Sequence, residues 1–381
     1  MTKPLDILFL KKSFLQKGGL EKQANLIVQG FASRGHNITI FTEDPNPKLD
    51  FETVICQKTQ GPSFLKSLHY SKEAKKFVNQ KKFDAVFSFD RTEEQSIMRL
   101  GNGLHKTYLE EKFRYLPWYK KILRKNPQDF ATLRLEQSAF HSRGLETVIT
   151  NSEMVKNELL QAYPVDCEKI HVIHNGVEWE ENALAFEESF SLTPSELPFS
   201  YDPSKIQLLF LGHGFKRKGL DFLLLALAHL NRDDFHLHIV GHDKNLSFYH
   251  GITNKHSLTK SVTFHGTTSS SKLFYQIADL CIIPSIYDPF ANVTVEALNF
   301  GCPVISSKKN GGSEILKKGM GLVIPDLNDD KELSKIIFNQ FKKKNYSSAS
   351  EIRKKIEHLD LKNQLSKLID LCEKRTYCHK M

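Results

Sequence analysis

Two carboxylates eight residues apart form the strongest chemical signal in this sequence. Asp288 stands in a loop that follows an apolar, strand-like run, and Glu296 falls in the early turns of a helix predicted to begin near Ala291. The N–H groups at such a helix start, here Ala291, Asn292 and Val293, lack partners within the helix and favour an anion. The segment therefore predicts a site where two carboxylates and a helix N-terminus face one ligand.

A cationic loop precedes this segment. Residues 214–219 read Gly-Phe-Lys-Arg-Lys-Gly, directly after a predicted strand and before a predicted helix over 220–230. Cations at the carboxyl end of a strand in an open α/β sheet lie where ligands bind, and Arg217 and Lys218 have the chemistry to hold a phosphate. A solvated basic turn would have the same composition.

A third candidate is the glycine pair Gly18 and Gly19, between the first predicted strand and a helix with apolar periodicity. Glycines let a ligand approach the backbone closely, and the helix start attracts phosphate. A plain strand-to-helix turn fits equally well. Neither this loop nor residues 212–214 has the G-x-G-x-x-G spacing, so an ordinary NAD dehydrogenase is disfavoured.

The elements that position these loops are predicted from short apolar runs, which are separated by stretches with helical periodicity. Strands that alternate with helices predict an α/β chain with parallel sheets covered on both faces. The runs lie at residues 5–10, 37–41, 84–89, 147–150, 170–173, 207–212, 236–241, 261–266, 280–284, 303–306 and 321–324.

The stretch over residues 178–203 is acidic, contains three prolines and has no clear strand, which is typical of a linker. We therefore expect a first domain over 1–180, a linker over 181–204 and a second domain over 205–360. A C-terminal helix over 361–381 is expected to return to the first domain.

Composition narrows the class of protein. The 381 residues are 40% hydrophobic and 25% charged, which predicts a globular chain of two or three domains. No apolar run approaches the ~20 residues of a membrane span, and the N-terminus begins with a strand pattern, so we expect a cytoplasmic protein. Six scattered cysteines give little support to zinc or redox chemistry. A net charge of +9 points weakly to an anionic partner.

The segment from Asp288 to Glu296, followed by E-A-x-x-x-G-x-P-V, resembles the signature of the family 4 retaining glycosyltransferases. The resemblance extends over nearly the whole chain and is strongest to the lipopolysaccharide core glucosyltransferases. It implies the GT-B fold, two Rossmann-like βαβ domains facing a central cleft. Further segments in family order are residues 18–19, 33–36, 101–105, 151–152, 175–177 and 217–219.

The resemblance also implies a role for each candidate residue. Gly18 and Gly19 would give room to the diphosphate and the acceptor, and Arg217 and Lys218 would neutralise the diphosphate as the sugar bond breaks. Glu296 would bind both ribose hydroxyls, and Asp288, where most relatives have glutamate, would contact the donor sugar. His105 would lie near that sugar.

The reaction expected from the resemblance moves a hexose, with retention, from a nucleoside diphosphate sugar such as UDP-glucose to a lipopolysaccharide core or related glycolipid. The chain has no D-x-D, so we expect no metal and no resident cofactor. Two alternatives remain open: a sugar-nucleotide epimerase of the same fold, and a non-catalytic membrane or nucleic-acid binder. The second leaves the carboxylates and both loops unexplained.

Residues 112–125 interleave aromatic and basic side chains. Such a surface suits an anionic membrane, where aromatics lie at headgroup depth and lysines meet lipid phosphate. A nucleic-acid surface, or a helix with a buried aromatic stripe, would look similar. Because the implied acceptor is lipid-linked, we expect peripheral contact with the inner face of the cytoplasmic membrane and no nucleic-acid partner.

Overall fold

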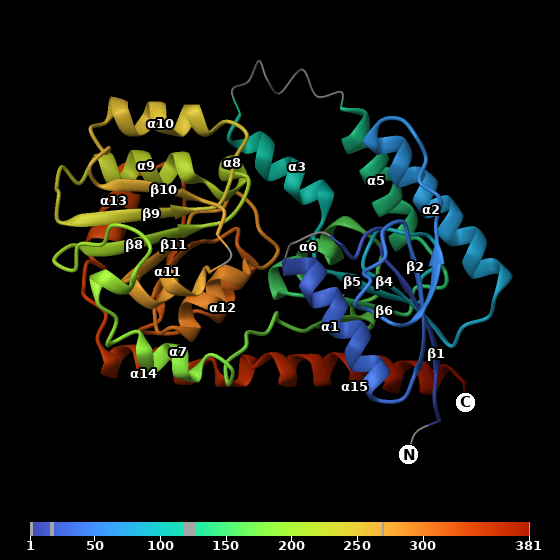
Figure 1. The fold of residues 1–381 in the computed structure, drawn as a ribbon. Helices are drawn as coiled ribbons and strands as arrows, with labels where there is room; N and C mark the ends of the chain where they lie inside the picture. The colour runs from blue at the N-terminus through green and yellow to red at the C-terminus, as the bar shows by residue number, and fades with distance from the viewer. Residues whose placement is uncertain (1–2, 16–18, 117–125, 269, 381) are drawn as a thin grey trace. The chain divides into compact units, whose positions relative to one another are not determined.

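The computed structural model describes residues 3–15, 19–116, 126–268 and 270–380, which form two α/β units (Figure 1). Unit 1 comprises residues 1–174 and 363–381, and unit 2 is the continuous segment 175–362. Each unit is built on one parallel sheet, as the alternating pattern predicts.

Unit 1 contains a seven-stranded sheet in the order β3-β2-β1-β4-β5-β6-β7. Alternate residues of its central strand serve two cores: Ile7 and Phe9 pack with α1 and α15, and Leu8 and Leu10 pack with α2. Both faces are thus buried, as in other parallel sheets. The strands are β1 (Asp6–Leu10), β2 (Asn37–Thr42), β3 (Glu52–Ile55), β4 (Ala85–Ser88), β5 (Ile97–Leu100), β6 (Thr147–Thr150) and β7 (Ile170–Val172). The helices are α1 (Gly19–Ser33), α2 (Ser63–Gln80), α3 (His105–Arg114), α5 (Pro127–Phe140), α6 (Glu153–Ala162) and α15 (Leu361–Lys380).

Unit 2 contains a six-stranded sheet in the order β10-β9-β8-β11-β12-β13. Helices α9, α10 and α13 cover one face, and α11 and α12 cover the other (Figure 1). The strands are β8 (Ile206–Leu211), β9 (Phe235–Val240), β10 (Val262–Gly266), β11 (Leu280–Ile283), β12 (Val304–Ser307) and β13 (Gly321–Ile324). The helices are α7 (Ala183–Glu188), α8 (Phe215–Lys218), α9 (Leu220–Ala228), α10 (Leu246–Lys255), α11 (Lys272–Ile277), α12 (Asn292–Asn299), α13 (Asp330–Phe338) and α14 (Tyr346–Lys355).

The unit borders differ from the sequence-based borders. The chain leaves unit 1 after His174, and residues 181–204, expected as a linker, lie within unit 2. They form α7 and a short 3-10 turn, and the buried Phe186 joins the core of unit 2. At the entry to unit 2, the Val177 N–H donates to the Leu359 carbonyl (3.0 Å) and the Leu361 N–H donates to the Val177 carbonyl (2.8 Å). The two chain crossings are therefore hydrogen-bonded to each other.

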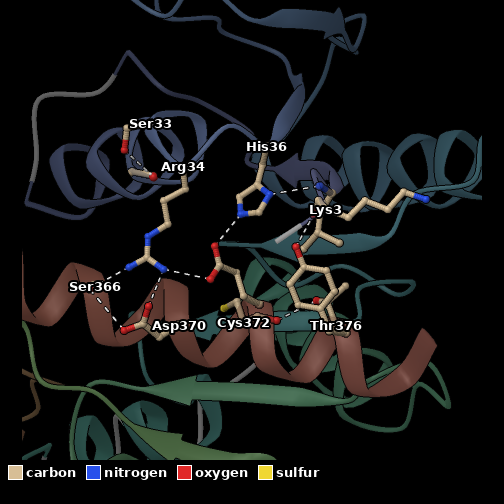
Figure 2. A network of polar contacts seen from close by, with 12 residues as sticks. Lys3, Ser33, Arg34, His36, Ser366, Asp370, Cys372 and Thr376 are labelled. Carbon is tan, nitrogen blue, oxygen red and sulfur yellow. Dashed lines mark hydrogen bonds and ion pairs between the residues drawn. The ribbon is translucent and has the colours of Figure 1, made fainter. Parts of the chain in front are cut away.

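The C-terminal helix α15 completes unit 1 through the polar network of Figure 2. Arg34 pairs with Asp370 (2.5 Å) and Glu373 (3.1 Å). His36 Nδ1 accepts from the Leu5 N–H, so its Nε2 carries the proton and donates to Glu373 (2.7 Å). Residues 33–36, one of the segments of the resemblance, thus hold α15 in place.

Candidate functional site

The carboxyl ends of β8 and β11 lie where the strand order of unit 2 reverses, because the chain runs outward from β8 through β9 to β10 and returns on the other side to β11. Ligands of open α/β sheets bind at such points. The cationic loop follows β8, and the loop that contains Asp288 follows β11.

The cationic loop needs its glycines. Gly214 (φ +71°) and Gly219 (φ +75°), which flank the short helix α8, are in the left-handed conformation. A Cβ at Gly219 would lie 1.8 Å from the Pro284 carbonyl oxygen, so only glycine lets this turn pack against the end of β11.

This packing places the side chains of Arg217 and Lys218 in contact with the same carboxylate, that of Asp288. Lys218 Nζ lies 2.6 Å and Arg217 Nη1 lies 2.9 Å from Asp288 Oδ2. Lys218 and Asp288 are buried, whereas the Arg217 side chain remains 38% exposed. Burial alone would raise the pKa of Asp288, but its ion pairs with Lys218 and Arg217 outweigh burial and lower that pKa. Asp288 is therefore ionised at neutral pH.

Asn310, which the sequence analysis missed, fixes the loop between Asp288 and α12. Its fully buried side chain accepts from the N–H groups of Ala291 (2.9 Å) and Gly312 (3.0 Å). It also donates to Thr294 (3.1 Å) and Ser306 (2.8 Å). A lone asparagine carries no sequence signal, and only the fold shows that all of its hydrogen-bonding groups are used here.

Helix α12 begins at Asn292, one residue after Ala291, and Val293 lies in its first turn. Asn175 Nδ2 donates to Asn292 Oδ1 (2.7 Å). Farther along, Glu296 Oε2 accepts from the Tyr275 hydroxyl (2.5 Å). Burial and the Glu296 carboxylate raise the pKa of Tyr275 well above its ordinary value, so the phenol keeps its proton and remains a donor. Tyr275 is a second residue that the sequence analysis missed.

The remaining candidates belong to unit 1. Gly19 is the first residue of α1, and Gly18 lies outside the described residues. His105 is the first residue of α3, where its Nε2 lies 3.0 Å from Asp129 Oδ1. Burial and the nearby Arg91 lower the pKa of His105 despite the opposing effect of Asp129, so its ring is neutral at pH 7.

The buried Glu136 orders the start of α3. Its carboxylate accepts from the N–H groups of His105 (2.6 Å) and Lys106 (3.2 Å), and it pairs with Arg91 (2.9 Å). Negative charge at a helix N-terminus is stabilising. The distant position of Glu136 in the sequence gave no indication of this role.

Two family models match the chain. Residues 198–359 match the model described as glycosyl transferases group 1, and residues 17–181 match the model described as glycosyltransferase family 4. Together they cover both units. The chain belongs to glycosyltransferase family 4.

The curated relatives that this family 4 glycosyltransferase matches are distant. An uncharacterized glycosyltransferase of Methanocaldococcus jannaschii is 30% identical over 175 residues, which cover 45% of this chain and 44% of the relative. The chain matches about half the length of this and other curated relatives.

Solved structures show the fold over the whole chain. WaaG, a glycosyltransferase involved in lipopolysaccharide biosynthesis, has a TM-score of 0.77 at 17% identity, over 96% of this chain and 99% of WaaG. The Anabaena protein HepE, solved in complex with UDP-glucose, has a TM-score of 0.68 at 17% identity, over 97% of this chain and 100% of HepE. These likenesses confirm the GT-B fold of the family 4 glycosyltransferase.

Three further features bear on the expected partners of this family 4 glycosyltransferase. Of the basic and aromatic segment 112–125, residues 117–125 lie outside the described residues. No described helix is long and apolar enough to cross a membrane. Among the residues that the structure describes, no group of three or more His, Cys, Asp or Glu is arranged to hold a metal ion.

Proposed function

We propose that this family 4 glycosyltransferase transfers a hexose, with retention of configuration, from a nucleoside diphosphate sugar to a saccharide acceptor. The observation that carries the proposal is the Asp288 carboxylate shared by Arg217 and Lys218, in the loops at the reversal point of the unit 2 sheet. A donor that has both a diphosphate and sugar hydroxyls matches this combination of fixed cations and a carboxylate.

In this proposal Arg217 and Lys218 bind the diphosphate. Negative charge grows on the departing phosphate as the bond to the sugar breaks, so cations held in advance stabilise the transition state more than the ground state. Gly18 and Gly19 leave room for the diphosphate. The N–H groups of Asn292 and Val293 add uncharged hydrogen-bond donors to it. The two cations take the electrostatic place of a metal ion.

Asp288 and Glu296 are assigned to hydroxyl groups. Both cations contact Oδ2 of Asp288, and among the described residues no hydrogen bond to its Oδ1 is observed, so Oδ1 is the oxygen assigned to a donor-sugar hydroxyl. Glu296 binds the ribose hydroxyls as a double acceptor. His105, with Nε2 engaged by Asp129, offers Nδ1 or its backbone carbonyl to the sugar.

We further propose UDP-glucose as the donor and a lipopolysaccharide core or related glycolipid as the acceptor, with residues 112–125 in peripheral contact with an anionic membrane. The support is the likeness to WaaG and to the UDP-glucose complex of HepE, together with the basic and aromatic composition of this segment. A cytoplasmic location follows from the proposed donor.

The test is product formation from a panel of UDP-, GDP- and ADP-hexoses with a lipopolysaccharide-core extract, comparing the wild type with Asp288→Ala. We expect transfer from one donor, retention in the product by anomeric NMR couplings, and a rate at least about 100-fold lower in the variant. Asp221→Ala is the matched control, because Asp221 also pairs with a lysine of α8, Lys216 (2.5 Å), but is assigned no donor contact. Equal losses in both variants would refute the role of Asp288.

A further inference from the structure

A cavity of unit 2, of about 350 Å³, lies between α7 and α14. We call it the α7–α14 cavity. Its volume falls within the range of about 300–1,000 Å³ that is typical of small-molecule sites. None of the residues assigned to the donor lines it.

Three aromatic side chains line the α7–α14 cavity: Trp179, Phe186 and Tyr346. Phe186 is buried, whereas Tyr346 is 51% exposed. The Tyr346 ring is held by a T-shaped contact with Phe190 (5.2 Å between centroids) and a tilted contact with Phe186 (6.0 Å). An exposed ring held by its neighbours offers an apolar surface at low entropic cost, as aromatic residues do at binding surfaces.

Arg353 makes the cavity wall rigid. Its guanidinium lies 4.2 Å from the Trp179 centroid and 5.1 Å from the Phe186 centroid, and it donates to the Trp179 carbonyl. The Trp179 indole N–H donates in return to the Arg353 carbonyl (3.0 Å). Burial lowers the pKa of Arg353, although Glu187 and Glu357 act in the opposite direction. The wall is thus set before any ligand arrives.

The charges that line the cavity cancel. The lining contains two cations, Arg353 and Lys354, and two carboxylates, those of Glu187 and Glu357. A strongly anionic or cationic ligand gains nothing from such a lining, whereas a hydroxyl group, which both donates and accepts, matches carboxylates and cations alike.

We propose that the α7–α14 cavity binds a neutral saccharide, with a sugar ring against Tyr346 and hydroxyl groups on Glu357 and on Glu187, whose Oε1 also accepts from the Tyr346 hydroxyl (3.1 Å). Apolar ring faces bordered by paired donors and acceptors complement a sugar, which has apolar C–H faces and hydroxyl edges. The proposal is independent of the transfer reaction, because binding here needs neither donor nor turnover.

The chain has two tryptophans, so Trp118→Phe leaves Trp179 as the sole indole fluorophore, inside the cavity. Titrating this variant with maltotriose and with cellotriose should give a saturable fluorescence change for at least one sugar, with a Kd in the millimolar range. Adding Tyr346→Ala or Glu357→Gln should weaken binding about 5-fold or more. Phe338→Ala, an exposed aromatic of α13, is the matched control.

Circular dichroism, measured in parallel on every variant, reports whether the protein is still folded. Three results would overturn the proposal: no saturable change with either sugar up to about 50 mM, an unchanged response after both cavity substitutions in a folded protein, or tighter binding of glucose 6-phosphate than of the neutral sugars. None of these results bears on the transfer assay, so the two proposals fail separately.

Discussion

Asp288 shares one carboxylate oxygen between a buried lysine and a partly exposed arginine. Two cations 2.6 and 2.9 Å from that oxygen more than offset the burial of the carboxylate, as its lowered pKa shows. The arrangement holds Arg217 and Lys218 in place in advance, which would lower the ordering cost of binding the proposed diphosphate. We infer that the short side chain of Asp288 brings both cations close to the end of β11.

Tyr275 is expected to position Glu296 for the ribose. Tyr275→Phe removes the 2.5 Å hydrogen bond and keeps the ring that stacks on Phe300. A hydrogen bond to a charged group contributes about 1.5–3 kcal/mol, so we expect UDP affinity to fall about 10-fold. Calorimetric titration measures this change.

The control is a ligand without the ribose contact. Binding of 2′,3′-dideoxyuridine diphosphate should be weak in the wild type and no weaker in Tyr275→Phe. If the variant loses affinity for both nucleotides by the same factor, Tyr275 supports the fold of unit 2 and does not orient Glu296.

At the residue scale, sequence could identify groups that belong to a contiguous motif. Asp288, Glu296, Arg217 and Lys218 could be proposed from the sequence because glycines, a proline and strand ends surround them at fixed spacing. Asn310 and Tyr275 were missed because each is a single polar residue whose partner is distant in sequence or on another helix. Such roles arise from tertiary packing, and a single sequence holds no trace of them.

At the scale of elements, His238 of β9, which is buried, and His265 of β10, which is partly buried, form a polar layer on the sheet of unit 2. His238 bonds to His265 (2.9 Å) through Nδ1 and to Gln207 (2.9 Å) through Nε2. Phe199, from the segment expected as a linker, covers His265 edge-on at 5.0 Å. Burial and nearby histidines lower the pKa of His238 to about 3 and that of His265 to about 4.

This layer should make unit 2 sensitive to acid. Both folded pKa values lie below the value of about 6.5 for an unfolded histidine, so the unfolded chain takes up protons first. The stability that the neutral rings contribute is present above pH 6.5 and is lost as pH falls toward about 4. His265→Gln should move the midpoint of acid unfolding to lower pH by roughly half a unit.

Circular dichroism during acid titration measures that midpoint. His256→Gln, at the C-terminal end of α10, is the control and should leave the midpoint unchanged. A midpoint that does not move in His265→Gln would mean that other groups limit acid stability.

Most elements could be predicted from periodicity, and the exceptions have physical causes. All eleven predicted strands are present, but β3 and β5 were missed. Strand β3 lies at the edge of its sheet with only partly buried or exposed residues, and its sequence, Glu-Thr-Val-Ile, gives an apolar run of only two residues. Strand β5 is fully buried but contains Arg99, which interrupts the apolar run.

For the whole molecule, the C-terminal helix is the feature on which unit 1 depends. The apolar side of α15 supplies Leu368, Ile369 and Cys372 to the core around β1 and α1. Burying a large apolar side chain contributes about 1.5–3 kcal/mol, a substantial part of the 5–15 kcal/mol typical of a folded domain. The neighbouring Gly30 leaves space for this contact, since a Cβ there would lie 2.7 Å from Ile369.

Removing residues 363–381 should therefore unfold or strongly destabilise unit 1 and spare unit 2. Differential scanning calorimetry should show loss of one transition, while the transition that shifts upward with UDP remains. Arg34→Ala should weaken unit 1 by a smaller amount, because it removes the ion pairs to Asp370 and Glu373 and leaves the apolar contact. Loss of the UDP-sensitive transition on truncation would show that unit 2 depends on the helix as well.

The order of the segments along the chain has a consequence for synthesis. Unit 2 is one continuous stretch, whereas unit 1 is interrupted by it and receives its last helix only from residues 363–381. During translation, all seven strands of the first sheet emerge before unit 2. The apolar surface that α15 covers in the folded protein therefore stays uncovered until unit 2 has been translated. The second-made unit can therefore reach its native state first, and a holdase chaperone has its longest opportunity to bind on the face that α15 later covers.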